Sequence, residues 1–133
     1  MTYLKQLNSI KNTIKEERTA LLKLERSVDQ SMVKAVNALS KTKGKIIITG
    51  IGKSGYIGLK LSATLSSTGS PAIYINSSEA NHGDLGVIQN NDIIIALSKS
   101  GKTKEMFPII NFAKNNKIEL IAITADPNSF LAK

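Results

Sequence analysis

The feature of this sequence that most restricts its fold is a series of four short β-branched runs, which begins after Lys43-Gly44. Helical segments separate the runs, and each run is too uniformly apolar to have one wet face. Such strands are typical of a parallel sheet that helices cover on both faces. The sequence therefore predicts an α/β fold, a three-layer doubly wound parallel sheet of flavodoxin-like type. We expect strands at Lys45–Thr49, Ala72–Asn76, Asp92–Leu97 and Glu119–Thr124, and helices at Gly55–Thr68 and Glu105–Asn115.

The first 40 residues follow a different pattern, because their apolar residues recur at helical spacing. Leu7, Ile10 and Ile14 belong to a first run, and a second run from Leu21 to Leu39 steps by threes and fours. We expect one long or two shorter amphipathic helices in residues 1–40, followed by the α/β domain in residues 41–133. The helical segment covers the domain, as amphipathic helices usually do, or pairs with another chain.

The last residues predict that the α/β domain is incomplete within this sequence. Asp126-Pro127 and the two residues after it resemble a helix start, with a cap and a proline near the first turn. Four parallel strands are few for a doubly wound sheet. We therefore expect the last strand and helix to be missing, either because the chain is truncated or because a partner completes the fold.

Composition restricts the environment and the partners. The sequence has no cysteine and no apolar run of the roughly 20 residues that span a bilayer, so we expect a cytoplasmic protein without membrane contact. The net charge of +8 raises the possibility of nucleic acid. The cations are scattered from Lys5 to Lys133 with few aromatic residues among them, so we expect no nucleic-acid partner. An attraction for anionic metabolites, or a solvated basic surface, explains the charge as well.

The first candidate loop is GIGKSG, Gly50–Gly55, at the carboxyl end of the first expected strand, where open α/β sheets bind ligands. It satisfies G-x-G-x-x-G, but a dinucleotide site needs an acidic residue about 20 positions on, where Asn76 stands. A dinucleotide is therefore disfavoured. Lys53 has an ammonium group beside free helix amides, which suits it to hold a phosphate or to polarise a carbonyl oxygen. The alternative is an ordinary solvated lysine.

The second candidate loop is SKSGKTKE, which precedes an expected helix. Ser98, Ser100 and Thr103 surround a glycine, and their hydroxyls together with backbone amides predict a phosphate cradle. The same residues are also ordinary helix caps. Glu105, in the expected first turn, either complements the helix dipole or faces the cleft as a base.

The third candidate loop contains His82, the single histidine of the chain. It follows the second expected strand, and Glu79 and Asp84 are near enough in sequence to orient the ring or change its pKa. A lone histidine is more often a structural hydrogen-bonding residue than a catalyst. At a strand end, beside a predicted phosphate cradle, we expect His82 to face the ligand.

Together these segments resemble a known family. The stretch TGIGKSGYIGLKLSATLSSTGSPAIYINSSEANHGDLGVI, followed by ALSKSGKTKE and LIAITADPNS, is similar to the sugar isomerase (SIS) domain, and within that family to the D-arabinose 5-phosphate isomerases. The resemblance covers the chain from about Ala20 to Lys133. Its most specific elements are GxGKSG, E-A-x-H-G-D-L-G and S-x-S-G.

The resemblance implies interconversion of D-ribulose 5-phosphate and D-arabinose 5-phosphate through a cis-enediol, at the start of the route to the Kdo sugar of lipopolysaccharide. It implies catalytic roles for Lys53, His82 and Glu105. It also implies a homo-oligomer, which is a tetramer in this family. We expect the protein to be cytoplasmic and to need no cofactor. His82 is the one residue that we consider as a candidate metal ligand. The residues that match the family's substrate-binding and phosphate-binding positions are Gly52, Ser54, Ser98, Ser100 and Thr103.

The sequence departs from the family in two respects. Lys102 stands where the family commonly has glutamate, so the charge beside the phosphate loop differs. The family's second glutamate and second histidine lie beyond the fourth strand, and the paired CBS domains of longer members are absent from this sequence. Two other hypotheses therefore stay open. One is a non-catalytic sugar-phosphate-binding SIS module, and the other is a nucleotide or nucleic-acid binder, which only the charge and the glycine pattern support.

Overall fold

A four-stranded parallel sheet is the centre of the fold, in a computed structural model that describes residues 2–80 and 83–133. The sequence prediction of a parallel α/β sheet is confirmed, and each strand lies within one residue of its predicted bounds. The reason is that isoleucine-rich runs are stable only where both faces of a sheet are covered. The strands are β1 (Ile46–Gly50), β2 (Ala72–Asn76), β3 (Ile93–Leu97) and β4 (Glu119–Ile123).

The strand order β2-β1-β3-β4 determines where a ligand can bind. From β1 the chain moves outward to β2, then crosses back to β3 and moves outward in the opposite direction to β4. The order therefore reverses between β1 and β3, whose residues are all buried. In a doubly wound sheet the crevice for a ligand opens at the carboxyl ends of the two strands that flank this reversal.

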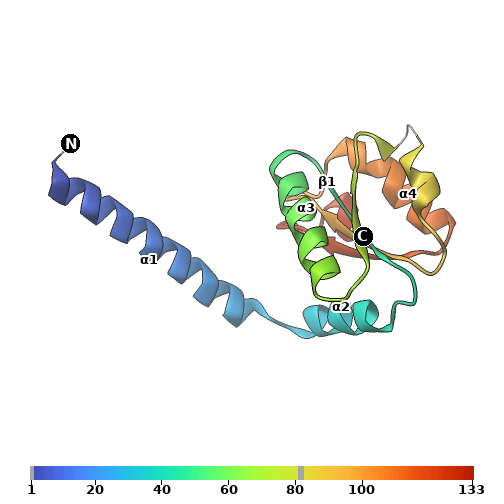
Figure 1. Cartoon of the computed structure of the whole chain (residues 1–133), viewed down its shortest axis with the longest axis horizontal. Coiled ribbons are helices and arrows are strands. Elements are labelled where there is room, and N and C mark those ends of the chain that lie inside the picture. The colour runs from blue at the N-terminus through green and yellow to red at the C-terminus, as the bar shows by residue number, and fades with distance from the viewer. Residues whose placement is uncertain (1, 81–82) are drawn as a thin grey trace. The chain divides into compact units, whose positions relative to one another are not determined.

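Helices cover the sheet on both faces, because right-handed crossovers that run in opposite directions place their helices on opposite sides. The helix α3 (Gly52–Ser67) packs Leu61 and Leu65 against Ile46 and Ile48 on one face. On the other face lies α4 (Phe107–Asn115), and Figure 1 shows the two helices on either side of the strands.

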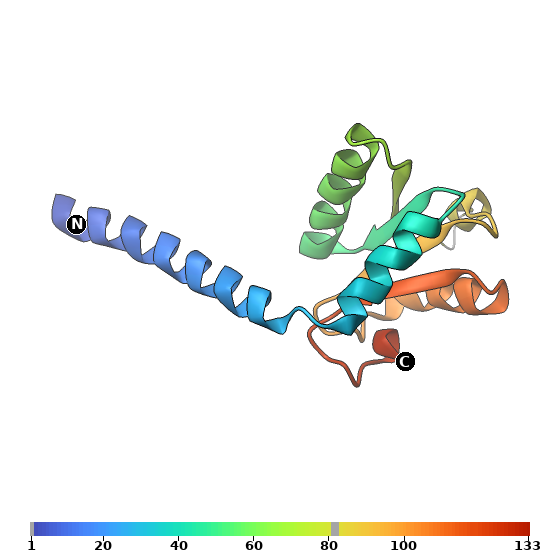
Figure 2. The same cartoon turned by 90° about the horizontal axis from the view of Figure 1, so that it is seen from below.

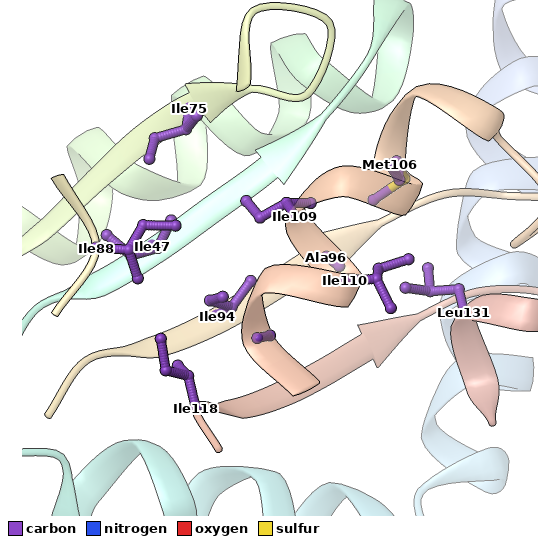
Figure 3. Packing of buried hydrophobic residues seen from close by; sticks show 11 residues of the cluster. Ile47, Ile75, Ile88, Ile94, Ala96, Met106, Ile109, Ile110, Ile118 and Leu131 are labelled. Carbon is purple, nitrogen blue, oxygen red and sulfur yellow. The ribbon is translucent and has the colours of Figure 1, made fainter. Parts of the chain in front are cut away.

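The α4 face contains the larger part of the hydrophobic core. Ile109 and Ile110 of α4 lie over Ile47 and Ile94 of the two central strands, as Figure 3 shows. Leu131, from the 3-10 turn η4 (Phe130–Ala132), completes this cluster, and η4 lies beside β4 (Figure 2). The helix start predicted at Asp126 is thus present as a single 3-10 turn.

The amino-terminal residues form two helices, α1 (Tyr3–Ser27) and α2 (Gln30–Lys41). Asp29 immediately precedes α2 and caps its amino-terminal end. Its carboxylate accepts hydrogen bonds from the backbone N–H and the hydroxyl of Ser31, at 2.8 and 2.6 Å. The chain divides into two compact units, residues 1–36 and 37–133. Within the first unit α1 has no buried residue, and within the second the last turn of α2 packs Ala38 and Leu39 on the sheet.

None of the helices within residues 2–80 and 83–133 combines the length and the apolar composition that a bilayer span requires.

A buried carboxylate connects the two residues that immediately precede the central strands, Lys45 before β1 and Asp92 before β3. Asp92, whose side chain is 1% exposed, accepts hydrogen bonds from the backbone N–H groups of Lys45 and Gln89 at 2.9 and 2.8 Å. It also forms an ion pair of 2.7 Å with the Lys45 ammonium. Burial raises the pKa of Asp92, but hydrogen bonds from the Lys45 side chain and from the two N–H groups outweigh it, so the pKa is lowered overall.

Replacing Asp92 with alanine should lower the free energy of unfolding by about 2–4 kcal/mol, because two backbone N–H groups and a cation lose the buried carboxylate that they bind. Because the pKa of Asp92 is lowered by folding, its contribution is complete above the ordinary carboxyl pKa and disappears as the pH falls through the folded value. Urea unfolding between pH 7 and pH 3 measures both effects. The control is Glu17→Gln, on the exposed surface of α1, which should lose little stability. A loss for Asp92→Ala as small as that of the control would contradict the prediction.

Candidate functional site

A cavity of about 420 Å³ opens at the carboxyl ends of β1 and β3, where the strand order reverses. It brings the first two predicted loops together, since Ser54 from the first lies with Ser98, Ser100 and Thr103 from the second. The remaining lining residues are Ile51, Leu97, Lys99, Ala125 and Asp126.

The loop after β3 contributes Ser98, Ser100 and Thr103, which all have a hydroxyl group, to the lining of this cavity. The Ser98 and Thr103 hydroxyls are 2.8 Å apart and hydrogen-bonded, and the Gly101 N–H donates to the Ser98 hydroxyl at 3.1 Å. The Lys102 N–H donates to the Ser100 hydroxyl at 3.2 Å. Gly101 has a φ of +63°, a left-handed backbone conformation that lets the loop turn here. Hydroxyl groups gathered on such a turn can donate hydrogen bonds to an anion.

The helix after this loop begins later than predicted. Glu105 lies in a separate 3-10 turn, η3 (Lys104–Met106), and α4 begins at Phe107, where Pro108 in its first turn favours a helix start. The predicted helix Glu105–Asn115 is therefore corrected at its first two residues. Glu105 is exposed and does not line the cavity.

The loop after β1 is shorter than predicted, because α3 begins at Gly52 and includes the segment expected to be loop as far as Gly55. The small residues of GIGKSG, which have low helix propensity, concealed this start. Only Ser54 of the three candidates in this loop lines the cavity. Gly52 and Lys53 lie on the exposed first turn of α3, outside the cavity lining.

Tyr74 is a residue near the site that was not predicted from the sequence. Its hydroxyl donates a 2.8 Å hydrogen bond to the carbonyl oxygen of Gly50, at the carboxyl end of β1, and its burial raises its pKa. A Cβ atom at Gly55 would lie 2.5 Å from the Tyr74 hydroxyl oxygen, so α3 approaches β2 closely here. Tyr74 thus fixes the passage from β1 into α3. A tyrosine among aliphatic strand residues was the available signal, since a buried hydroxyl needs a partner.

The third loop is described on both sides of His82, which itself lies outside the described residues. Ala80 before it and Ile88 after it are buried, and Leu85 packs against the core from the 3-10 turn η2 (Asp84–Val87). The ends of the loop are therefore anchored. Glu79 and Asp84 are exposed.

The prediction of His82 as a metal ligand falls outside the residues that the structure describes. Elsewhere in residues 2–80 and 83–133, no three acidic side chains lie close enough together to hold a metal ion.

The segment of residues 124–131 is hydrogen-bonded to the loop of residues 98–103. The Ala125 N–H and the Thr124 hydroxyl donate to the carbonyl oxygen of Lys99 at 3.0 and 3.3 Å, and the Leu131 N–H donates to that of Gly101 at 3.1 Å. The loop is thus bonded to residues about 25 to 30 positions further along the chain. The sequence indicated only a helix start in this segment, because contacts at such a separation leave no local pattern.

Comparison with known proteins agrees with this arrangement. The SIS domain family matches residues 38–133. The chain is 42% identical over 130 residues to arabinose 5-phosphate isomerase KdsD of Francisella tularensis, and 41% identical over 127 residues to the enzyme of that name from Pseudomonas aeruginosa. Each alignment covers 96% of this chain, and the chain spans only 40% and 39% of the two relatives.

A solved structure shows the same architecture. A protein of Escherichia coli CFT073, determined in complex with arabinose 5-phosphate, has a TM-score of 0.93 and 33% sequence identity to this chain. The superposition covers 99% of this chain and 70% of that one. The family resemblance predicted from the three loops is confirmed, and the chain belongs to the SIS domain family.

Proposed function

We propose that this chain binds a sugar phosphate and interconverts D-ribulose 5-phosphate and D-arabinose 5-phosphate, in the cytoplasm and on the route to Kdo and lipopolysaccharide. The observation that carries the proposal is the cavity in which Ser54, Ser98, Ser100 and Thr103 meet at the strand reversal. Hydroxyl groups of this kind can donate hydrogen bonds to phosphate oxygens. The relatives named arabinose 5-phosphate isomerase, and the related structure with arabinose 5-phosphate, support a pentose 5-phosphate as the ligand.

The proposed reaction moves two protons without a cofactor. A base removes the proton from carbon 2 of the aldose, and the resulting cis-enediol receives a proton at carbon 1, while the hydroxyl proton passes from oxygen 2 to oxygen 1. We assign Lys53, His82 and Glu105 to this chemistry, with the lysine ammonium as the group that stabilises the enediolate oxygen. Lys53 and Glu105 are exposed, and each is within two residues in sequence of a residue that lines the cavity, Ser54 and Thr103 respectively.

We also propose that the protein is a homo-oligomer, a tetramer by family resemblance, in which the segment 1–40 contacts a neighbouring subunit beside the SIS unit 41–133. The apolar residues of the amino-terminal unit support this, since Ile10, Ile14, Leu21 and Leu24 of α1 are between 53% and 65% exposed. An apolar stripe of this size on one helix is typical of a helix with a partner. Neighbouring subunits would then add side chains to one another's sites.

The second candidate function is a sugar-phosphate-binding module without turnover. The observation that favours it is that Lys53 and Glu105, which we assign to the chemistry, lie outside the lining of the cavity. Turnover of D-ribulose 5-phosphate by the purified chain, with the oligomeric state recorded on the same sample, separates the two functions. Binding of D-arabinose 5-phosphate without turnover would favour the module, and absence of both would refute the two proposals together.

Ser98→Ala should raise KM for the sugar phosphate about tenfold and change kcat much less, because it removes the hydroxyl that bonds both Thr103 and the Gly101 N–H. Steady-state kinetics with the pentose phosphate measure the two constants. Ser67→Ala is the matched control, since the Ser67 hydroxyl only bonds the carbonyl of Thr64 near the far end of α3. An unchanged KM for Ser98→Ala would show that this loop does not hold the phosphate.

A further inference from the structure

The cavity contains a negative charge that its proposed ligand would oppose. Asp126 lines the cavity together with Ser98 and Ser100, and 32% of its side chain is exposed. A phosphate ester is mostly a dianion at pH 7. A carboxylate at the same opening therefore repels it, unless another charge neutralises that carboxylate.

Lys102 supplies the opposite charge. Its ammonium nitrogen is 3.0 Å from a carboxylate oxygen of Asp126. The hydrogen bond from the Lys102 side chain is the main cause that holds the pKa of Asp126 below its ordinary value, and the Asn128 N–H and the charges of Lys102 and Lys133 add to it. Asp126 is therefore ionised at neutral pH, and Lys102 is its direct partner.

The position of Lys102 allows it to serve a second anion. Its backbone is fixed, because its N–H donates to the Ser100 hydroxyl within the phosphate loop. Its side chain is 69% exposed, so the ammonium is free to move between Asp126 and a ligand in the cavity. An exposed ion pair contributes little to folding. Its effect on the electrostatic potential in the adjacent cavity is independent of stability and is measured by the affinity for an anionic ligand.

We propose that Lys102 is a specificity-determining residue that neutralises Asp126 at the opening of the cavity and so allows a phosphate dianion to bind there. The inference rests on the proposed function, because it concerns the same phosphate loop. Neutralisation by Lys102 removes the repulsion between Asp126 and a phosphate dianion at the cavity. It predicts that the two residues act as a unit, so that removing the carboxylate makes the cation dispensable.

The test is a double-mutant cycle on the full chain, with inorganic phosphate and D-arabinose 5-phosphate as probes in isothermal titration calorimetry. Lys102→Met should weaken the binding of each probe by about three- to tenfold at low salt, the range expected for a screened charge a few ångströms from a dianion. Asp126→Asn keeps the oxygen that accepts from the Asn128 N–H. Combined with Lys102→Met, it should restore affinity to within about twofold of the parent chain.

The control is Lys104→Met, which removes an equal charge two residues away. Both lysines are exposed and outside the cavity lining, but the ion pair with Asp126 is formed by Lys102 and not by Lys104. Lys104→Met should change the affinity for phosphate less than twofold. The loss of affinity in Lys102→Met should be smaller in about 0.5 M salt, because the Debye length is then only about 4 Å. Equal losses for Lys102→Met and Lys104→Met, or no rescue by Asp126→Asn, would overturn the inference.

These outcomes are distinguishable from failure of the proposed function. A parent chain that binds inorganic phosphate but not D-arabinose 5-phosphate refutes the substrate, while the cycle is still read with inorganic phosphate. A parent chain that binds neither probe overturns both the phosphate cradle and the role of Lys102.

Discussion

Lys53→Ala is expected to lower kcat/KM for D-ribulose 5-phosphate by about a hundred- to thousandfold, the usual loss when one donor to a developing oxyanion is removed. Lys53 is exposed on the first turn of α3, so its removal should leave the free energy of unfolding nearly unchanged. Steady-state kinetics and urea unfolding on the same preparation separate the two effects. Because the residue is also suited to bind phosphate, we expect KM to rise as well as kcat to fall.

The matched control is Lys60→Ala, an exposed lysine two turns further along the same helix, which should keep full activity. Lys53→Arg retains the charge but changes its geometry, and should recover part of the substrate affinity without the full rate. If Lys53→Ala and Lys60→Ala had the same kinetics as the parent chain, Lys53 would be an ordinary solvated lysine. The glycines around it would then serve only the turn into α3.

Gly101→Ala is expected to reduce phosphate binding more than tenfold and to lower the free energy of unfolding by about 2–4 kcal/mol. The φ of +63° at this position is unfavourable for alanine. A Cβ atom there would also overlap the buried Ser129 side chain and lie 2.9 Å from the Thr124 hydroxyl. The segment 124–131 would have to move, and the loop that it shapes would move with it. Calorimetry with inorganic phosphate and urea unfolding measure the two losses.

Two variants separate the causes of this loss. Gly69→Ala is the control for backbone strain, because Gly69 has a φ of +92° with open space where the Cβ would lie. It should cost about 1–2 kcal/mol of stability and leave phosphate binding intact. Adding Ser129→Gly to Gly101→Ala should relieve the overlap and recover part of the binding. Normal phosphate affinity in Gly101→Ala alone would show that the loop tolerates the movement and that its shape is not what binds the anion.

The sheet was predictable because its signal is local. Ile46, Ile47 and Ile48 are apolar on both sides of the strand, and only a sheet covered on two faces accepts such a run. The start of α3 was not predictable to better than three residues, since Gly52 and Ser54 have lower helix propensity than most residues and tertiary packing decides the boundary. Propensity is a weak guide wherever packing determines which residues continue a helix.

The candidate site was predictable in part for the same reason. Ser98, Ser100 and Thr103 lie within six residues of one another, so sequence alone indicated a cradle, and the cavity contains all three. The contact of Lys102 with Asp126 joins residues 24 positions apart, as does the hydrogen bond from Tyr74 to Gly50. Neither has a local pattern. Such partners become visible only when the fold brings two loops to the same edge of the sheet.

The hydrogen bonds between the loop of residues 98–103 and the segment 124–131 have a consequence for synthesis on the ribosome. Gly101 accepts its hydrogen bond from Leu131, which is added to the chain 30 residues later. At translation rates of about 5–20 residues per second, roughly 2–6 s pass between the synthesis of Gly101 and that of Leu131, the residue that bonds it. A nascent chain halted between these two positions should already contain its first three strands and still be unable to retain a phosphorylated sugar.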